Sequence, residues 1–286
     1  MTIFLIIFVI IVSFLVWSGL VEPHWYRLKR IKVRQKKIRR PISILHLSDI
    51  HFIKTPGSKR RFFQKLSMLN PDLIFLTGDI IDNNEGIDTA VRFISGLRAR
   101  YGTFLVLGNH EYYDYQWLDN VRYHVGLSKT SATRNNVSLF IAELKKIGVH
   151  VLVNEPMRLE VHGNPVFIGG TDDPVTQRVD FERTLHGMGP QSLNILLAHH
   201  LDALLKLSHH GVDLVFSGHT HGGQIRLPFL GPIVCETKLP RRYVEGLHEY
   251  KGMTVFVSRG LGTGRSLFPR FFCRPEAIFF ELEPMP

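Results

Sequence analysis

Cysteine is scarce in this 286-residue sequence, which contains only Cys235 and Cys273. Two thiols cannot form the disulfide framework that stabilises small secreted domains, and we expect both to be reduced. The sequence also lacks low-complexity tracts, and 44% of its residues are hydrophobic and 11% aromatic. Disordered chains do not have this apolar content. The composition therefore predicts a folded protein with a buried core.

Acidic residues are nearly missing from the first 40 positions, where Glu22 stands alone against nine Lys and Arg residues. This segment therefore carries +8 of the net charge of +10, and residues 41–286 are close to neutral. A protein that binds DNA or RNA along a broad surface needs positive charge on its folded body. We therefore expect no nucleic acid partner.

Charge is absent from residues 3–21, which read IFLIIFVIIVSFLVWSGLV. A helix of about 20 apolar residues can cross the hydrocarbon core of a bilayer. No Lys or Arg precedes this run and no small-residue cleavage site follows it, which favours an uncleaved anchor over a secretory signal peptide. The basic residues that follow favour the cytoplasmic side of a membrane and suit anionic lipid headgroups. We expect a transmembrane anchor over 1–22, a basic juxtamembrane linker over 23–40 and a catalytic domain over 41–286.

Short apolar runs alternate with amphipathic stretches throughout the expected catalytic domain, residues 41–286. We predict strands at 42–47, 73–77, 103–107, 149–153, 166–169, 194–198, 214–217, 254–258 and 277–282. Helices fit between them at 59–69, 89–98, 139–147 and 202–209. Such alternation predicts an α/β protein, and so many short strands predict two packed sheets with helices outside.

Polar clusters follow five of the predicted strands. They read LHLSDIHF, LTGDIID, LGNHE, LLAHH and FSGHTHGG. One such cluster is more often a turn or a helix cap than a ligand site. In layered α/β proteins, however, ligands bind outside the carboxyl ends of the strands, where all five clusters would meet. Carboxylate, amide and imidazole together suit divalent transition metals, and the lack of thiolate argues against a structural zinc site.

Read in order from Asp49 to His221, the clusters are D-x-H, G-D-x-x-D, G-N-H-[D/E], a lone His and G-H-x-H. This pattern resembles the signature of calcineurin-like metallophosphoesterases, which hydrolyse phosphate esters with two metal ions. The resemblance implies their four-layer fold, a two-sheet β-sandwich flanked by helices, here with an N-terminal transmembrane helix. It also places the metals at the strand ends.

The resemblance further implies two sets of metal ligands that share a bridging carboxylate. The first set is Asp49, His51, Asp79 and His221. The second set is Asp79, Asn109, His199 and His219. We take His199 over His200 because the ligand in similar sequences is the first His after the apolar strand, and a contribution from His200 stays open.

His110 and Asp82 would act beside the metals. Two divalent ions would clamp the attacking and leaving oxygens and activate water near neutral pH. By resemblance, His110 would lie beside the substrate phosphate, offset its charge and protonate the leaving group. Asp82 would orient His110. We expect manganese, with iron or zinc as alternatives.

The C-terminal half contains the further motifs GHTHGGQIRLP, RRYVEGL, SRGLGTG and CRPE. Together with EPHWYRLKRIKV after the anchor, they resemble a bacterial branch of membrane-associated phosphoesterases that includes a UDP-2,3-diacylglucosamine pyrophosphatase of lipid A synthesis. The arginines that extend two motifs in protein serine/threonine phosphatases are missing here. Together with the apolar run and the basic residues after it, this predicts a single-pass enzyme of the inner membrane with a cytoplasmic catalytic domain. Its leading substrate would be UDP-2,3-diacylglucosamine, with release of UMP.

Two other functions stay open. One is a general phosphodiesterase or phosphatase that acts on small nucleotides or other phosphoesters. The other is a catalytically silent binding module, against which the complete ligand set argues. Arg241 and Arg242 are candidates for substrate binding because guanidinium groups match phosphate oxygens. Aromatic residues at 112–124 and around Arg270 at 266–275 suit either a bilayer interface or ordinary packing.

Overall fold

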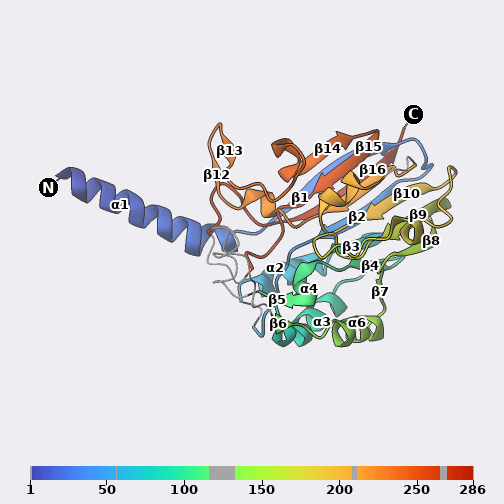
Figure 1. Ribbon diagram of the computed structural model, residues 1–286, viewed down its shortest axis with the longest axis horizontal. Helices are drawn as coiled ribbons and strands as arrows, with labels where there is room; N and C mark the ends of the chain where they lie inside the picture. Colours follow the sequence, from blue (N-terminus) through green and yellow to red (C-terminus); the bar gives the residue numbers. More distant parts are fainter. Residues whose placement is uncertain (1, 56, 116–132, 208–210, 265–268, 286) are drawn as a thin grey trace.

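The computed structural model describes residues 2–55, 57–115, 133–207, 211–264 and 269–285. Two six-stranded sheets face each other, helices cover the first sheet, and a long N-terminal helix projects from this body (Figure 1). The strand orders are β1-β16-β2-β3-β4-β7 in the first sheet and β14-β15-β11-β10-β9-β8 in the second. The predicted α/β fold, a two-sheet sandwich flanked by helices, is confirmed.

All nine predicted strands occur, with ends that shift by a few residues. The first sheet contains β1 (Arg27–Gln35), β2 (Ile42–Leu47), β3 (Leu73–Thr77), β4 (Thr103–Val106), β7 (Val149–Val151) and β16 (Glu276–Pro284). The second contains β8 (Glu155–Val161), β9 (Asn164–Gly170), β10 (Leu193–Leu197), β11 (Leu214–Ser217), β14 (Gly246–Tyr250) and β15 (Met253–Val257). Two short pairs are β5 (Tyr113–Asp114) with β6 (Thr133–Arg134), and β12 (Arg226–Leu227) with β13 (Gly231–Pro232).

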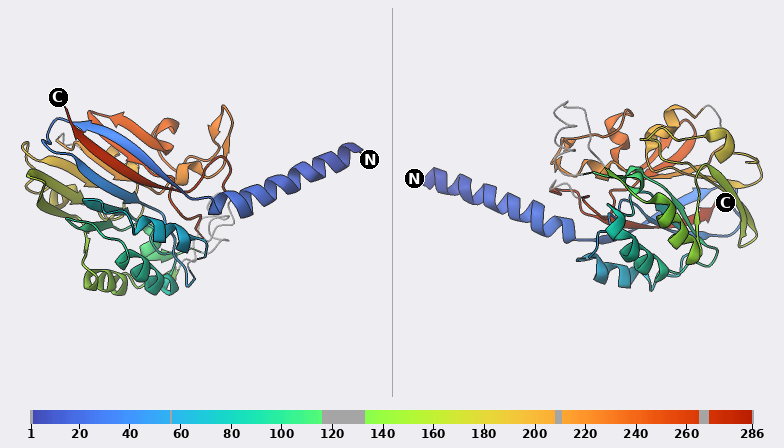
Figure 2. Two further views of the ribbon diagram at one scale, coloured as in Figure 1. Left: turned by 180° about the vertical axis from the view of Figure 1, so that it is seen from behind. Right: turned by 60° about the horizontal axis from the view of Figure 1, so that its bottom comes forward.

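Three amphipathic helices lie against the outer face of the first sheet (Figure 2). They are α2 (Lys59–Leu66), α3 (Ile87–Ser95) and α6 (Val137–Lys146). Shorter helical turns are η3 (Asn84–Gly86), α4 (Asn109–Tyr112), α7 (Phe181–Thr184), η4 (Leu201–Leu205), η5 (His221–Gly223) and η6 (Arg241–Val244). The helix expected at 202–209 is the 3₁₀ turn η4, and positions 208 and 209 lie outside the described residues.

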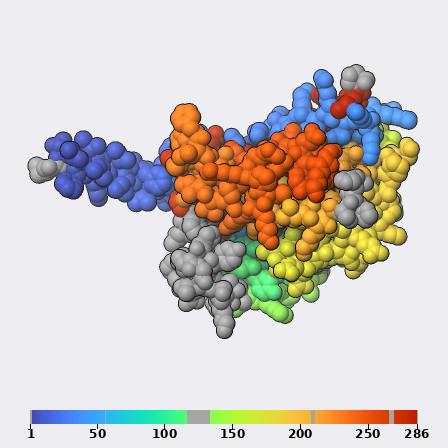
Figure 3. All heavy atoms as spheres, turned by 45° about the horizontal axis from the view of Figure 1, so that its top comes forward, coloured from blue at the N-terminus to red at the C-terminus, as the bar shows by residue number. Residues whose placement is uncertain are grey.

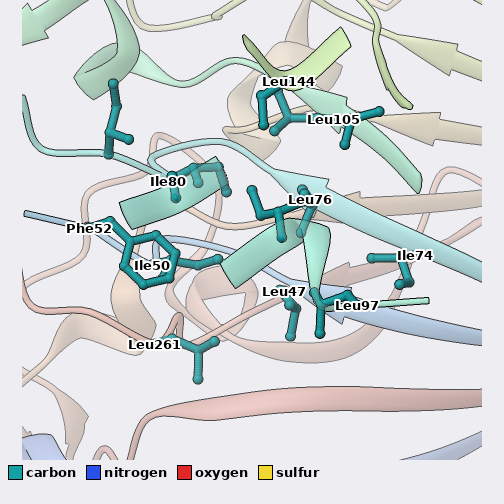
Figure 4. Packing of buried hydrophobic residues seen from close by; sticks show 14 of the residues in the cluster. Leu47, Ile50, Phe52, Ile74, Leu76, Ile80, Leu97, Leu105, Leu144 and Leu261 are labelled. Atoms are coloured by element: carbon teal, nitrogen blue, oxygen red, sulfur yellow. The ribbon is translucent and has the colours of Figure 1, made fainter. Parts of the chain in front are cut away.

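The hydrophobic core has a layer on each side of the first sheet. Leu47, Leu76 and Leu105 point from neighbouring strands toward the helices, where Leu144 of α6 joins them (Figure 4). A second layer fills the space between the sheets. Because β3 is buried on both faces, its sequence is a continuous apolar run. Buried strands of this kind hold the loops at their ends in fixed positions.

The segment expected to be a basic linker contains a strand. β1 pairs in parallel with β16 along its whole length, and its pairs with the acidic residues of β16 include Arg27–Glu276 at 2.7 Å and Lys32–Glu283 at 2.7 Å. Ile31 and Val33 alternate with exposed basic residues, the period-two pattern of an edge strand. A nine-residue strand is roughly 25–30 Å long, so the far end of this segment does not stay beside the anchor.

The N-terminal apolar segment is helical from Thr2 to His24, as α1 (Thr2–Val16), the π turn η1 (Trp17–Val21) and the 3₁₀ turn η2 (Glu22–His24). It has the length and composition to cross a membrane, and little of it is buried against the protein. Figure 2 shows it leaving the body as an isolated rod. The apolar helix contacts the protein only near its C-terminal end, for example where Phe14 packs against Phe271, and an apolar surface exposed along most of its length suits a lipid environment.

Candidate metal centre

The functional motifs meet because they follow strands whose carboxyl ends lie at one edge of the sandwich. β2, β3 and β4 are parallel neighbours in the first sheet, and β10 and β11 are parallel neighbours in the second. The loop after each of these strands carries one polar cluster. Each sheet therefore contributes ligands to a site between their ends, as expected for layered α/β proteins.

The backbone of these loops is strained where the ligands sit. Asp49, His51, Asp79, His219 and His221 all have positive φ, between 49° and 70°. Residues other than glycine rarely adopt this conformation, and such strain gathers at functional sites because the surrounding structure enforces it. The strain turns five side chains away from regular strand geometry and toward one another.

Two glycines allow the loops to approach closely. A Cβ atom on Gly78 would overlap His199 Nδ1, and one on Gly108 would overlap Asp79 Oδ1. Gly78 also has a φ of 78°. Any side chain at these positions would push the β3 and β4 loops away from the candidate ligands, so the motif needs glycine here.

Hydrogen bonds fix the orientation of two imidazoles. His199 Nδ1 donates to the carbonyl oxygen of Thr77 at 2.8 Å, and its Nε2 is directed at Asp79 Oδ2, 3.2 Å away. His51 Nδ1 donates to Asp82 Oδ1 at 2.6 Å, and its Nε2 faces His221 Nε2 at 3.3 Å. A histidine that donates from one nitrogen presents the other as a metal ligand.

In the described part of the chain, the candidate ligands form three clusters, two of which contain Asp79. Ligand atoms of three sets lie within 4.8 Å of one another: Asp49, His51 and His221; His51, Asp79 and His110; and Asp79, His199 and His219. Among the described residues, Asp49 Oδ2 and Asn109 Oδ1 are buried without a hydrogen-bond partner. Buried polar atoms need a partner, and hard oxygens beside imidazoles suit a divalent cation. The residues present therefore fit metal ions in this site.

Asp82 contacts two histidines and not only the expected one. It lies 2.6 Å from His51 Nδ1 and 3.2 Å from His110 Nδ1. Burial opposes a charged imidazole, but Asp79 and Asp82 together raise the pKa of His110 to about 9. The pKa of Asp49 is raised, because burial and the negative charge of the nearby Asp79 both disfavour its anionic form.

The ring of His200 packs against His219, with centroids 4.2 Å apart, but its nitrogens are directed at other groups. Its Nε2 donates to the carbonyl oxygen of Glu236 at 2.7 Å, and its Nδ1 accepts the backbone N–H of Asp202 at 2.9 Å. Both ring nitrogens are therefore satisfied by the protein. His199, with one nitrogen directed at Asp79, is the better candidate ligand.

Glu111 has a structural role that sequence reasoning did not assign. Its carboxylate is fully buried and accepts the backbone N–H groups of Gly108, Asp79, Ile80 and Ile81 at 2.6–3.2 Å. These groups belong to the loops after β3 and β4. Glu111 thereby fastens two ligand-bearing loops together, and its position at the end of GNHE was the available signal.

A cavity of about 990 Å³ opens above the cluster. His51, Asp79, Asn109, His110, His219 and His221 line it. Lys206 and Lys238 line it as well, and sequence reasoning missed them because exposed lysines give no signal. A cavity of this size accommodates a ligand much larger than inorganic phosphate.

Arg241 and Arg242 are not in the cavity wall of the described structure. Arg241 donates to the carbonyl oxygen of Pro232, and Arg242 lies over the ring of Tyr243 at 4.9 Å. Both guanidinium groups therefore have other partners. The placement does not favour the predicted substrate-binding role, which a sequence pattern alone could not test.

The two aromatic segments, residues 112–124 and 266–275, have different surroundings. In the first, Tyr112 donates to Asp172 at 2.6 Å and Tyr115 lines the cavity, whereas positions 116–124 lie outside the described residues. In the second, Arg270 is fully buried and donates to carbonyl oxygens, including that of Gly262 at 2.6 Å, so it packs in the core. Phe272 is exposed, and position 268 lies outside the described residues.

Comparison with known proteins agrees with this geometry. The profile of the calcineurin-like phosphoesterases matches residues 42–223, more than half of the chain. An uncharacterized metallophosphoesterase of Bacillus subtilis, YkuE, is 29% identical over 93% of this chain and 89% of its own. The UDP-2,3-diacylglucosamine pyrophosphatase LpxG of Chlamydia muridarum and the phosphodiesterase YaeI of Escherichia coli are each 28% identical, over 91% of this chain and 90% of theirs.

These matches and the metal-binding clusters define a metal-dependent hydrolase of phosphoric esters. The chain belongs to the calcineurin-like phosphoesterase family. Members of this family use divalent metal ions.

Proposed function

We propose that this protein is a membrane-anchored phosphoesterase that uses two divalent metals to hydrolyse a pyrophosphate or phosphodiester bond in a lipid-linked substrate. The observation that carries the proposal is the carboxylate of Asp79, which lies in one cluster with His51 and in another with His199 and His219. Bound there, two divalent cations, in our proposal manganese, would polarise the phosphoryl group and activate water. The remaining roles belong to the protein.

The protein positions each donor before substrate arrives. Asp49, His51 and His221 would hold one cation, Asn109, His199 and His219 the other, and Asp79 both. Asp82 keeps His51 oriented through the 2.6 Å contact and lies beside His110. His110 borders the cavity, where a protonated imidazole would offset phosphoryl charge and give its proton to the leaving group.

The leading substrate candidate is UDP-2,3-diacylglucosamine, with release of UMP. Two features support this choice: the similarity to LpxG and an apolar N-terminal helix of membrane-spanning length. An acylated sugar nucleotide partitions into a membrane, where this helix would hold the enzyme. We place the catalytic domain on the cytoplasmic side of the inner membrane because basic residues follow the helix. Lys206 and Lys238 in the cavity wall suit the second phosphate of a diphosphate.

The experiment compares UDP-2,3-diacylglucosamine with its deacylated form in the presence of manganese, by following UMP. Each buried methylene group contributes about 0.8 kcal/mol, so an enzyme built for the lipid should strongly prefer it. Equal rates would refute the lipid-specific function. No UMP from either substrate would favour the alternative, a general phosphodiesterase or phosphatase that acts on small nucleotides or other phosphoesters.

A further inference from the structure

An uncharged hairpin stands on the surface between Arg226 and Glu236. β12 and β13 form its stem, and its large apolar side chains are exposed to solvent. The exposed fractions are 110% for Phe229, 67% for Leu230 and 57% for Ile233. Folded proteins rarely leave several neighbouring large apolar side chains in water unless another phase or molecule covers them.

The base of this hairpin is joined to the end of the N-terminal helix. The backbone N–H of Arg226 donates to the carbonyl oxygen of Phe271 at 2.9 Å, and the ring of Phe271 packs against Phe14 of α1 with centroids 4.8 Å apart. The neighbouring Arg270 N–H donates to Ser18 O at 2.9 Å. Figures 1 and 3 show the orange hairpin on the face of the body from which the blue helix emerges.

We propose that residues 227–234 are a second membrane contact, which inserts its apolar side chains into the bilayer interface beside α1. The proposal rests on the membrane anchor of the proposed function and adds how the folded body is oriented on the membrane. A lipid bilayer covers the apolar surface of the hairpin. A helix that enters the membrane carries the hairpin to the membrane surface, because the two are joined through Phe271.

The charges near the hairpin are arranged for this contact. Arg226 turns toward the body, where it donates to Gly222 O at 2.9 Å and lies 3.0 Å from Glu245. Residues 227–234 themselves carry no charge, and Arg241, which donates to the carbonyl oxygen of Pro232, lies at the stem of the hairpin and not at its tip. Trp17 and Trp25 pack edge to face at the end of the helix, at 5.7 Å, and Trp25 is half exposed. Tryptophan is favoured at the bilayer interface, so the helix end and the hairpin would lie at the same depth.

The hairpin would also bring the cavity to the membrane. Its last residue, Val234, and the adjacent Cys235 line the cavity above the candidate metal centre. With the hairpin in the interface, the mouth of the cavity opens beside the acyl region. A lipid-linked phosphate ester would then reach the metals while its chains stay in the bilayer.

The experiment places a nitroxide probe on the full chain in phospholipid vesicles, at Phe229→Cys and, separately, at Leu230→Cys. Both variants carry Cys235→Ser to limit labelling to the new thiol, and Cys273 is fully buried. The matched control is Lys251→Cys, which is also exposed, in a hairpin turn and at positive φ. That turn precedes β15 and thus lies at the opposite end of the sheet from the site.

Collisions of the probe with oxygen and with a water-soluble nickel chelate distinguish the outcomes. We expect the oxygen-to-nickel ratio at 229 and 230 to exceed that at 251 several-fold. An equal ratio in chains that float with the vesicles would overturn the hairpin proposal and leave the anchor standing. Low collision with both reagents would mean that a second copy or another protein surface covers the hairpin, which also overturns it. Chains that fail to float would overturn the anchor as well.

Discussion

Asp79 is the residue on which both proposed cations depend. Its carboxylate lies 3.2 Å from His199 and 3.9 Å from His51, which belong to different ligand sets. Asp79→Asn should therefore reduce binding at both positions, since a neutral amide is a weaker bridge between two cations. Manganese content measured by elemental analysis should fall from about two ions per chain to well below one.

The control for this variant is Asp72→Asn. Asp72 is also buried, but it precedes β3 at the far end of the strand and binds Ser43 and His162. It should leave the metal content unchanged. Full metal content or full activity in Asp79→Asn would contradict the bridging role.

His110 should affect turnover far more than metal content. It borders the cavity, and its imidazole is held beside Asp82. His110→Ala should lower kcat by about 10²–10⁴-fold, the usual contribution of a general acid. Steady-state kinetics and elemental analysis of the same preparation test this together. A rate like that of the unmodified enzyme would remove His110 from the mechanism, and loss of metal would make it a ligand.

Among the helices and strands, the N-terminal helix depends on Glu22 for its attachment to the body. Its carboxylate is buried and accepts the backbone N–H groups of Phe272, at 3.0 Å, and Cys273, as well as Trp17 Nε1 at 2.9 Å. Hydrogen bonds to a charged group contribute about 1.5–3 kcal/mol. Glu22→Ala should therefore speed amide exchange in residues 269–275 by roughly 10–100-fold.

Hydrogen–deuterium exchange with peptide-level mass spectrometry measures this change. Glu283→Ala is the matched control, because it removes only the exposed ion pair with Lys32. Unaltered exchange of residues 269–275 in Glu22→Ala would show that other contacts hold the end of the helix.

His46 links the packing of the two sheets to pH. It lies on β2 against Phe216 and Phe256 of the second sheet, and burial lowers its pKa to about 3. The unfolded chain takes up this proton below a pH of about 6.5, whereas the folded protein does not. The free energy of unfolding is therefore unaffected by His46 above that pH. As the pH falls from there toward 3, it decreases by about 1.4 kcal/mol per pH unit.

His46→Leu should remove this part of the pH dependence. Urea unfolding of both proteins in detergent at pH 7, 6 and 5 gives the free energies of unfolding. Plotted against pH, the free energy of unfolding should be steeper for the unmodified protein than for the variant. The difference should approach the value for one proton, about 1.4 kcal/mol per pH unit. Identical slopes would mean that His46 is protonated in the folded state.

The whole molecule has one proposed orientation in the membrane. If the helix spans the inner membrane with its basic end inside, protease added to intact spheroplasts should spare the catalytic domain, and lysis should expose it. Immunoblotting of the domain reads out both conditions. Cleavage before lysis, or a mature chain that starts after residue 22, would contradict this orientation.

The sequence by itself determined the chemistry and the class of fold. Five motifs that follow apolar runs predicted which side chains meet, because strand ends of a layered sheet share one edge. The buried strands were predictable for a different reason, because a strand buried on both faces is a continuous apolar run in the sequence. Even the period-two pattern of β1 was present in the sequence, but its high charge favoured the linker interpretation.

Only the tertiary structure decided what depends on contacts between distant residues. The charges of β1 are matched by acids on β16, some 250 positions later. His200 is occupied by the carbonyl group of Glu236, and Arg270 by carbonyl groups of the core, although both looked available in the sequence. A side chain's partners are set by the three-dimensional path of the backbone. Residue types and spacing therefore predict the donors of a site, and the fold decides which of them remain free to act.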